Sequence, residues 1–268
     1  MMTNCFLSEI NIYPIKSLGG ISLQSAEVEE RGLRYDRRWM LVDERNCFIT
    51  QRSYPQMALI KVNRKHNLFT ATHKQSELPP LVIPDFPYDE EEIDVQIWKD
   101  NVTALKYNDD VNEWFTKAIG INCCLVYMPD STKRKTNPDF AKNKIVSFAD
   151  GYPFLIIGEA SLNELNNRLT VPLPMNRFRP NLVFNGGNSF DEDNWKNVRI
   201  GNAEFKVVKP CSRCSITTVN QETSERGKEP LTTLAQFRSN DGQVLFGQNM
   251  VCERTGVITV GDEIYPAG

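Results

Sequence analysis

Cys211 and Cys214 form a Cys-x-x-Cys motif within the segment PCSRC, between two runs that are rich in β-branched residues. Thiols at this spacing can bind a metal ion, exchange electrons as a dithiol, or supply a nucleophile. A structural zinc site usually needs four ligands, but the chain has no second Cys-x-x-Cys and only two histidines, both distant in sequence. A structural zinc site is therefore not predicted.

The sequence also lacks the features that usually accompany the other two thiol chemistries. A thioredoxin-like dithiol normally opens a helix, whereas the run SITTV after Cys214 predicts a strand. A papain-like nucleophile has a histidine base beside it, and no histidine is suitably placed, which leaves this chemistry unsupported but open. A thiolate that acts as a soft metal ligand needs no histidine, so the motif favours this chemistry.

A metal held by one cysteine must take its other ligands from a cofactor, which needs a binding site of its own. Basic residues beside predicted turns could form that site, because Arg and Lys bind phosphate and carboxylate oxygens. The candidates are Lys16 and Ser17 in YPIKSLGG, Arg37 in RYDRRW, Arg179 and Asn181 in RFRPNLV, and Arg213 in the motif. Each of these residues alone is typical of a solvated surface. Their order along the chain, taken together with PCSRC, is a far more specific pattern than any one of them.

The elements that would position these residues are mostly strands. Short β-branched and aromatic runs, separated by turn residues, recur along the whole chain, as in barrels and sandwiches. The predicted fold class is therefore mainly β with a few helices (α+β). The predicted strands are SEINIYPI, RWMLVD, CFITQR, MALIKVN, LFTATH, DVQIW, VTALKY, CCLVYMP, PFLIIG, NLVFNG, EFKVVKP, SITTVN and GVITVGDEI.

Three short amphipathic helices are predicted to pack against these strands. The first begins at a capping box in residues 110–113 and ends at Gly120. The cap pattern is repeated from Ser161 to Glu164 at the start of the second helix. Pro230 opens the third.

The polar and basic segment 129–145 (PDSTKRKTNPDFAKNKI) has no periodicity and predicts a linker or a mobile flap. A flap could cover the site, or the segment could be a docking patch for an acidic redox partner. We expect a first domain at residues 1–128 and a second at 146–268.

The composition indicates a folded chain with no general attraction for polyanions. Of the 268 residues 40% are hydrophobic, and the formal net charge is −3, so no nucleic-acid partner is expected. No run approaches the ~20 apolar residues of a membrane span, and the first residues lack a signal-peptide pattern. We therefore expect no membrane span and a cytoplasmic location.

The seven cysteines are an odd number, which favours reduced thiols over a disulfide framework. Outside the motif, cysteines in or beside apolar runs are expected to be small buried residues. These are Cys5, Cys47, Cys123, Cys124 and Cys252.

These motifs together resemble the MOSC family, named for the C-terminal domain of molybdenum-cofactor sulfurase, preceded by its N-terminal β-barrel domain. The first part resembles that barrel domain through INIYPIKSLGG and RGLRYDRRWMLVD, and the second resembles the catalytic domain through NRFRPNLVFNG and KPCSRCSITTVN. The likeness covers nearly the whole chain. Within the family, the chain resembles the amidoxime-reducing proteins of mitochondria and bacteria, which reduce N-hydroxylated compounds.

The resemblance implies a Mo-molybdopterin cofactor with Cys214 as the metal ligand. It assigns the pterin and its phosphate to Lys16, Ser17, Arg37, Arg179, Asn181, Ser212 and Arg213. Asp150 would be a polar contact near the metal and, with water, a source of protons, whereas Cys211 receives no ligand role. At Gly151 and Tyr152 the mitochondrial relatives carry small hydroxyl-bearing residues, so the corresponding side-chain contacts are not expected.

The implied activity is reduction of a small N-oxygenated substrate such as an amidoxime, a hydroxylamine or an N-hydroxylated base. Some bacterial relatives carry a further ferredoxin-like domain, but after Cys214 this sequence contains only Cys252, too few cysteines for a cluster. A separate electron-transfer protein is therefore expected, ferredoxin-, flavin- or cytochrome b5-like. Two alternatives remain: a persulfide sulfur carrier at Cys214, and a carrier module that delivers the cofactor to other enzymes.

Overall fold

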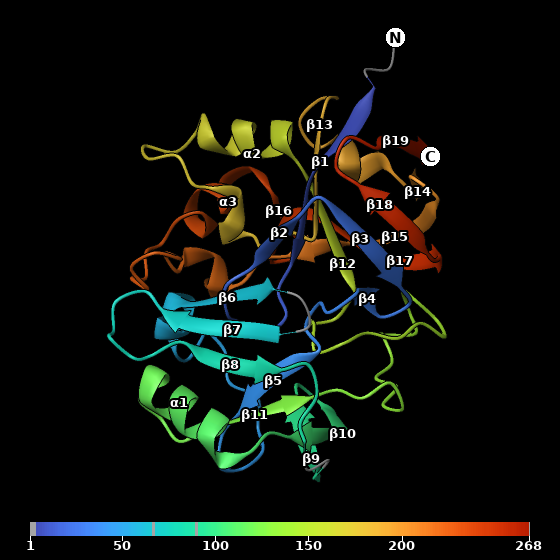
Figure 1. Cartoon of the computed structure of the whole chain (residues 1–268). Helices are drawn as coiled ribbons and strands as arrows, with labels where there is room; N and C mark the ends of the chain where they lie inside the picture. Colours follow the sequence, from blue (N-terminus) through green and yellow to red (C-terminus); the bar gives the residue numbers. More distant parts are fainter. Residues whose placement is uncertain (1–3, 66–67, 89–90, 268) are drawn as a thin grey trace.

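Seven strands close into a barrel that holds both ends of the described chain (Figure 1). The computed structural model describes residues 4–65, 68–88 and 91–267. In order around the barrel the strands are β12 (Phe154–Gly158), β13 (Leu182–Asn185), β1 (Cys5–Ile12), β19 (Glu263–Ala267), β14 (Asn197–Ile200), β15 (Ala203–Ser212) and β17 (Gln243–Arg254). Pairing of β17 with β12 closes the ring. The predicted fold class, mainly β with a few helices, is confirmed.

The sequence of β12 explains its place in the barrel. All five of its residues (FLIIG) are buried, as expected of a strand that is covered on both faces. It runs parallel to β13, and α2 (Glu159–Asn166) follows it in the connection between them. Phe154, Phe184 and Phe205 are among the buried side chains of the barrel core.

Smaller strands extend the barrel. β2 (Ile21–Leu23) pairs with β1, and β16 (Ser239–Asn240) pairs with β17 beside α3 (Leu231–Phe237). A separate sheet joins β18 (Gly256–Thr259), β3 (Ser25–Glu29) and β4 (Gly32–Leu33). The barrel lobe therefore contains strands from both parts of the sequence.

A second lobe, below the barrel in Figure 1, contains two sheets and α1 (Asp109–Ile119). One sheet has the order β5 (Trp39–Val42), β11 (Cys124–Tyr127), β10 (Asp100–Lys106) and β9 (Glu92–Ile97). The other has β6 (Ile60–Lys65), β7 (Leu68–His73) and β8 (Leu81–Pro84), preceded by the 3-10 helix η1 (Pro55–Leu59). Their shared core includes Trp39, Phe69 and Phe115.

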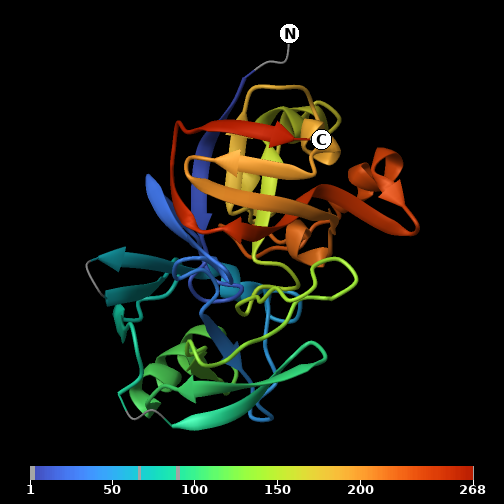
Figure 2. The same cartoon turned by 90° about the vertical axis from the view of Figure 1, so that its right-hand side faces the viewer.

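Residues 129–150 pass between the two lobes without forming a helix or strand (Figure 2). Arg134 is buried in this segment and donates hydrogen bonds to the carbonyl oxygens of Ser147, Ala149 and Asp150. It also forms an ion pair with Asp100 at 2.8 Å. We propose a domain division at residues 129–145. In the structure, β1 from the first part pairs with β13 and β19 from the second part.

Two predicted strands are wrong. In CFITQR, only isolated bridges occur at Cys47 and Phe48, and the Thr50 hydroxyl accepts a hydrogen bond from the Arg52 N–H and starts a turn. SITTVN contains the 3-10 helix η4 (Ser215–Thr218). There the hydroxyls of Thr217 and Thr218 donate to the carbonyl oxygens three residues earlier, which gives a β-prone run a helical turn.

The helices are confirmed with different starting points. The N-cap of α1 is Asn108, whose side chain accepts a hydrogen bond from the Val111 N–H, and Gly120 ends the helix with φ 81° as predicted. α2 begins at Glu159, because the Ser161 hydroxyl bonds to Glu192 and does not cap the helix.

Among the described residues, no helix is long and apolar enough to cross a membrane. All seven cysteines lie in the described part and none forms a disulfide. Cys5, Cys123 and Cys252 are buried as expected, whereas Cys47 and Cys124 are partly exposed.

Candidate functional site

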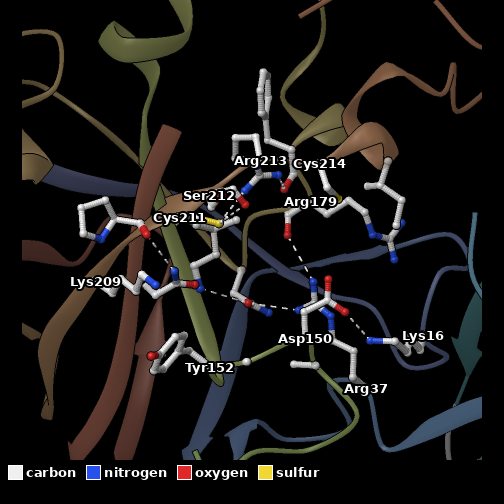
Figure 3. A pocket seen from close by; sticks show the side chains of 18 of the residues that line it. Lys16, Arg37, Asp150, Tyr152, Arg179, Lys209, Cys211, Ser212, Arg213 and Cys214 are labelled. Carbon is white, nitrogen blue, oxygen red and sulfur yellow. Dashed lines mark hydrogen bonds and ion pairs between the residues drawn. The ribbon is translucent and has the colours of Figure 1, made fainter. Parts of the chain in front are cut away.

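One cavity of about 270 Å³ gathers every residue that the sequence assigned to the site. It is lined by residues from both parts of the chain, and Figure 3 shows Lys16 and Arg37 across from the Ser212–Cys214 segment. The predicted residues on its wall are Lys16, Ser17, Arg37, Asp150, Arg179, Asn181, Ser212, Arg213 and Cys214. Residues that lie up to about two hundred positions apart in sequence thus share one cavity.

Cys214 lies where β15 ends and η4 begins. It is the N-cap of η4, and its carbonyl oxygen accepts hydrogen bonds from the backbone N–H and the hydroxyl of Thr217. The register of β15 against β17 shifts between Pro210 and Ser212, and this end of the strand lines the cavity. Strand pairing before Cys214 and the 3-10 helix after it therefore fix the backbone that carries the thiol.

Three of the predicted residues hold an unusual backbone conformation. Ser17, Arg37 and Arg179 have φ values of 67°, 48° and 55°, in the left-handed region that non-glycine residues rarely occupy. Such strain persists only where the surrounding structure imposes it, and it is concentrated at functional sites. Its occurrence at three residues of one cavity supports a binding role for the cavity.

A network of buried groups orients the arginines. Arg37 donates to Asp36 Oδ2 at 2.7 Å and to Asn181 Oδ1 at 3.1 Å. Arg37 and Arg179 also lie against the ring of Tyr13, with their guanidinium carbons 4.4 and 4.2 Å from its centroid. Both cations are therefore held in place before any ligand binds.

Asp150 joins two cations near Cys214. Its carboxylate accepts from Lys16 Nζ and from Arg52 Nη2, each at 2.5 Å. Burial alone would raise the pKa of Asp150, but Lys16 and Arg52 hold it well below its usual range. Burial lowers the pKa of Lys16 to about 8 against the opposing attraction of Asp150. At neutral pH the aspartate is ionised and the lysine is mostly charged.

Arg52 reaches from Asp150 to the motif. Its Nε lies 3.3 Å from Cys214 Sγ, which is a hydrogen-bonding contact. Arg52 was not predicted from the sequence, because its contacts with Cys214 and Asp150 join distant parts of the chain. Its only local signal was that of a basic residue beside a turn, which other arginines of the chain share.

Two buried donors on the cavity wall have no hydrogen-bond partner among the described residues. They are Arg179 Nη2 and Arg213 Nε. Burial lowers the pKa of Arg179 to about 10, so it remains charged at neutral pH. Unpaired buried donors are costly, and an anion with several oxygens would satisfy them. The donor set therefore fits a cofactor that carries a phosphate.

Other residues on the wall received no cofactor role from the sequence. Cys211 lines the cavity, and Arg213 Nη1 lies 2.9 Å from its Sγ, so its thiol supports an arginine of the site. Gly151, Tyr152 and Lys209 also line it. Within the described ranges, no group of three or more His, Cys, Asp and Glu residues could hold a metal ion. A metal here would depend on ligands from a cofactor.

Comparisons with known proteins find two family models that match the chain. The family described as "MOSC N-terminal beta barrel domain" matches residues 5–122, and the one described as "MOSC domain" matches residues 143–265. Mitochondrial amidoxime-reducing component 1 of Mus musculus is 32% identical over 98% of this chain and 82% of its own length. Mitochondrial amidoxime reducing component 2 of Rattus norvegicus is 34% identical over 97% and 82%.

A second group of relatives is longer. Molybdenum cofactor sulfurase of Oryza sativa subsp. japonica is 31% identical over 99% of this chain, which spans only 36% of that protein.

Proposed function

Because the chain belongs to the MOSC family, we propose that it is a molybdenum-cofactor-dependent oxidoreductase that reduces N-hydroxylated compounds, with Cys214 as the protein ligand of the metal. A function related to the molybdenum cofactor follows from the relatives. The reductase activity, the residue roles and the substrate are our proposal. The observation that supports it most is the Cys214 thiol in one cavity with charged arginines and unpaired donors.

When bound, the molybdenum cofactor supplies a centre that exchanges two electrons with a substrate and, in turn, with a separate electron donor. The net reaction breaks an N–O bond: the substrate takes up two electrons and two protons and yields the reduced nitrogen compound and water. Ferredoxin-, flavin- and cytochrome b5-like proteins have the chemistry of such a donor.

The residues of the chain would bind and orient the cofactor. Arg179 and Arg213 would bind its phosphate oxygens through the two donors that have no partner among the described residues, because guanidinium groups suit such oxygens. Lys16, Ser17, Arg37, Asn181 and Ser212 complete the wall, and Cys214 supplies the thiolate. Arg52 would hold that thiolate in place.

The role of proton source that was expected for Asp150 does not fit its surroundings. Its pKa is held well below the usual range by Lys16 and Arg52, so at neutral pH it has no proton to give. We therefore propose that Asp150 positions these two cations and that water supplies the protons of the reaction.

A direct assay tests the proposal. Purified, metal-replete protein with a chemical reductant should convert benzamidoxime to benzamidine, measured by chromatography. Cys214→Ser should lower this rate by ~100-fold or more, because removing a group that acts on the reacting centre costs several powers of ten. Cys47→Ser, a partly exposed cysteine outside the site, is the matched control. Full activity in Cys214→Ser would refute the assignment.

The likeness to the sulfurases favours a second candidate function, a sulfur carrier with a persulfide on Cys214. Elemental analysis separates the two, since the reductase should contain stoichiometric molybdenum. A sulfur carrier should contain little, with a sulfur adduct in its intact mass. A module that only delivers the cofactor would bind molybdenum but show no turnover.

A further inference from the structure

A second cavity, of about 950 Å³, adjoins the candidate cofactor cavity. Asp150, Gly151 and Tyr152 line both cavities and form their common wall. Tyr152 is seen at the edge of the first cavity in Figure 3. A small molecule in the second cavity would therefore lie beside the space that contains Cys214.

Aromatic side chains line part of the second cavity: Phe48, Trp98 and Tyr152. The ring centroids of Phe48 and Trp98 are 5.0 Å apart. Trp98 lies in the turn between β9 and β10 and is 42% exposed, whereas the other three tryptophans of the chain are at most 9% exposed. An exposed tryptophan on the wall of a cavity is suited to stack on a flat ring.

The backbone of Trp98 supports the same conclusion. Its φ is 55°, in the left-handed region, where tight hairpins usually place Asn, Asp or Gly. A bulky residue in this conformation is strained, and such strain is typical of functional positions. The turn therefore places a conformationally strained tryptophan at the cavity wall, although a glycine or asparagine would form this hairpin with less strain.

Arg52 connects the aromatic wall with the motif. Its guanidinium carbon lies 4.7 Å from the centre of the Trp98 ring, while its Nε contacts Cys214 Sγ at 3.3 Å. Only the Arg52 side chain would thus lie between Trp98, on which the ring stacks, and the proposed metal ligand.

The charges around the second cavity are mainly positive. Lys99, Arg134 and Lys135 line it, together with Asp100 and Asp150. Both carboxylates are already paired, Asp100 with Arg134 and Asp150 with Lys16 and Arg52. Lys99 and Lys135 are exposed, and within the described chain neither forms an ion pair. Two free ammonium groups at one cavity attract anions and repel cations.

We propose that the second cavity is a substrate subsite for aromatic N-hydroxylated compounds that carry an anionic group, with the ring against Trp98 and the anion toward Lys99 and Lys135. This inference rests on the proposed reductase function and names its substrate class. The chemical step is the one given above, cleavage of the N–O bond with two electrons from the reductant and two protons from water.

Three substrates test the subsite in the holoenzyme with a chemical reductant. Benzamidoximes with a 4-carboxylate or a 4-aminomethyl group differ in charge, and N-methylhydroxylamine lacks the ring. We expect kcat/KM to be ~10-fold higher for the carboxylate than for the aminomethyl compound. In Trp98→Ala, the ratio of kcat/KM for the carboxylate over N-methylhydroxylamine should fall by ~10-fold.

Charge reversal provides the matched control. The double variant Lys99→Glu and Lys135→Glu should invert the preference between the two benzamidoximes. Lys196→Glu with Lys228→Glu makes the same change in net charge at exposed lysines outside both cavities and should keep the preference. An unchanged preference in the first double variant would overturn the subsite. No turnover of any of the three compounds would instead reject the proposed reductase function.

A binding measurement makes the subsite testable without turnover. The unreactive 4-carboxybenzamide should quench the tryptophan fluorescence of the holoenzyme in a saturable manner. Trp98→Phe keeps an aromatic ring but removes the exposed tryptophan, so this quenching should disappear. Equal quenching in Trp98→Phe and the unmodified protein would show that the ligand binds elsewhere and would contradict the inference.

Discussion

Arg52 is the side chain through which the first part of the chain contacts the proposed metal ligand. It lies between β5 and η1, in a turn that begins at Thr50. Its guanidinium contacts Cys214 Sγ and Asp150 Oδ2 at the same time. The fork geometry of arginine allows this, because its nitrogens point in fixed and different directions.

Replacing Arg52 by lysine tests this arrangement. Lysine keeps the charge but cannot donate to both partners in fixed directions, so kcat/KM of the holoenzyme should fall by about 10- to 100-fold, the usual worth of a charge-assisted hydrogen bond. Steady-state reduction of benzamidoxime measures the effect. Arg45→Lys, at an exposed arginine nearby, should have no effect. Equal rates in both variants would show that the two contacts of Arg52 are unimportant for the reaction.

The residues of the site were predictable where a local motif marked them. PCSRC, KSL and RFRPN each place a reactive or basic side chain beside a turn, and all of the residues assigned from them line one cavity. Arg52 and Tyr13 were missed, because each has a partner far away in sequence, Cys214 for Arg52 and Arg179 for Tyr13. No local pattern distinguishes Arg52 from other arginines at the ends of strands.

At the scale of elements, Glu192 ties β12 and α2 to the 3-10 helix η3 (Asp191–Asn194). It is fully buried, and its carboxylate accepts hydrogen bonds from the Gly158 N–H at 3.1 Å and the Ser161 hydroxyl at 2.9 Å. Burial raises the pKa of Glu192 above the ordinary value of 4.5 despite these hydrogen bonds. The folded protein therefore binds this proton more tightly than the unfolded chain.

This shift predicts a pH dependence of stability. Since the folded state holds the Glu192 proton to higher pH, the free energy of unfolding should decrease as pH rises from the ordinary glutamate value to the raised one. The decrease amounts to about 1.4 kcal/mol for each unit by which the pKa is raised. Glu192→Gln removes the titration, so its unfolding free energy should change less as pH rises from about 4.5.

Urea unfolding at several pH values measures this difference. The exposed Glu113→Gln on α1 is the control and should follow the unmodified protein. If Glu192→Gln and Glu113→Gln showed the same pH dependence, Glu192 would not titrate as its burial implies.

Secondary structure was predictable where periodicity alone decides it. α1 has its apolar residues on one face and a glycine stop, and β12 is a short apolar run, so both were found. η4 was not, because Thr residues favour strands until their hydroxyls bond to the preceding turn. That choice depends on the position of Cys214 at the end of β15, which the sequence does not reveal.

At the scale of the molecule, the site lies where the two lobes meet. β1 belongs to the barrel, and the residues that follow it, Lys16 and Ser17, line the cavity opposite the end of β15. Lys16 Nζ donates to the Phe148 carbonyl oxygen at 2.7 Å and to Asp150. The beginning of the chain is therefore joined to the segment that separates the lobes.

The order of strands around the barrel was beyond prediction from the sequence. Each strand can be recognised by its composition, but β1 pairs with β13 and β19, which follow more than 160 positions later. Composition does not encode such pairing, because many apolar strands could replace one another at an edge. The resemblance to the MOSC family supplied what periodicity could not, a barrel and a site shared by both parts.

The central claim is that Cys214 binds molybdenum together with a pterin cofactor held by cations from both lobes. X-ray absorption at the molybdenum edge of the purified protein, combined with metal analysis, tests it most directly. We predict stoichiometric molybdenum with sulfur ligands in the unmodified protein, and one sulfur ligand fewer in Cys214→Ser. An identical sulfur coordination in the two proteins, or a lack of molybdenum in the purified unmodified protein, would contradict the account.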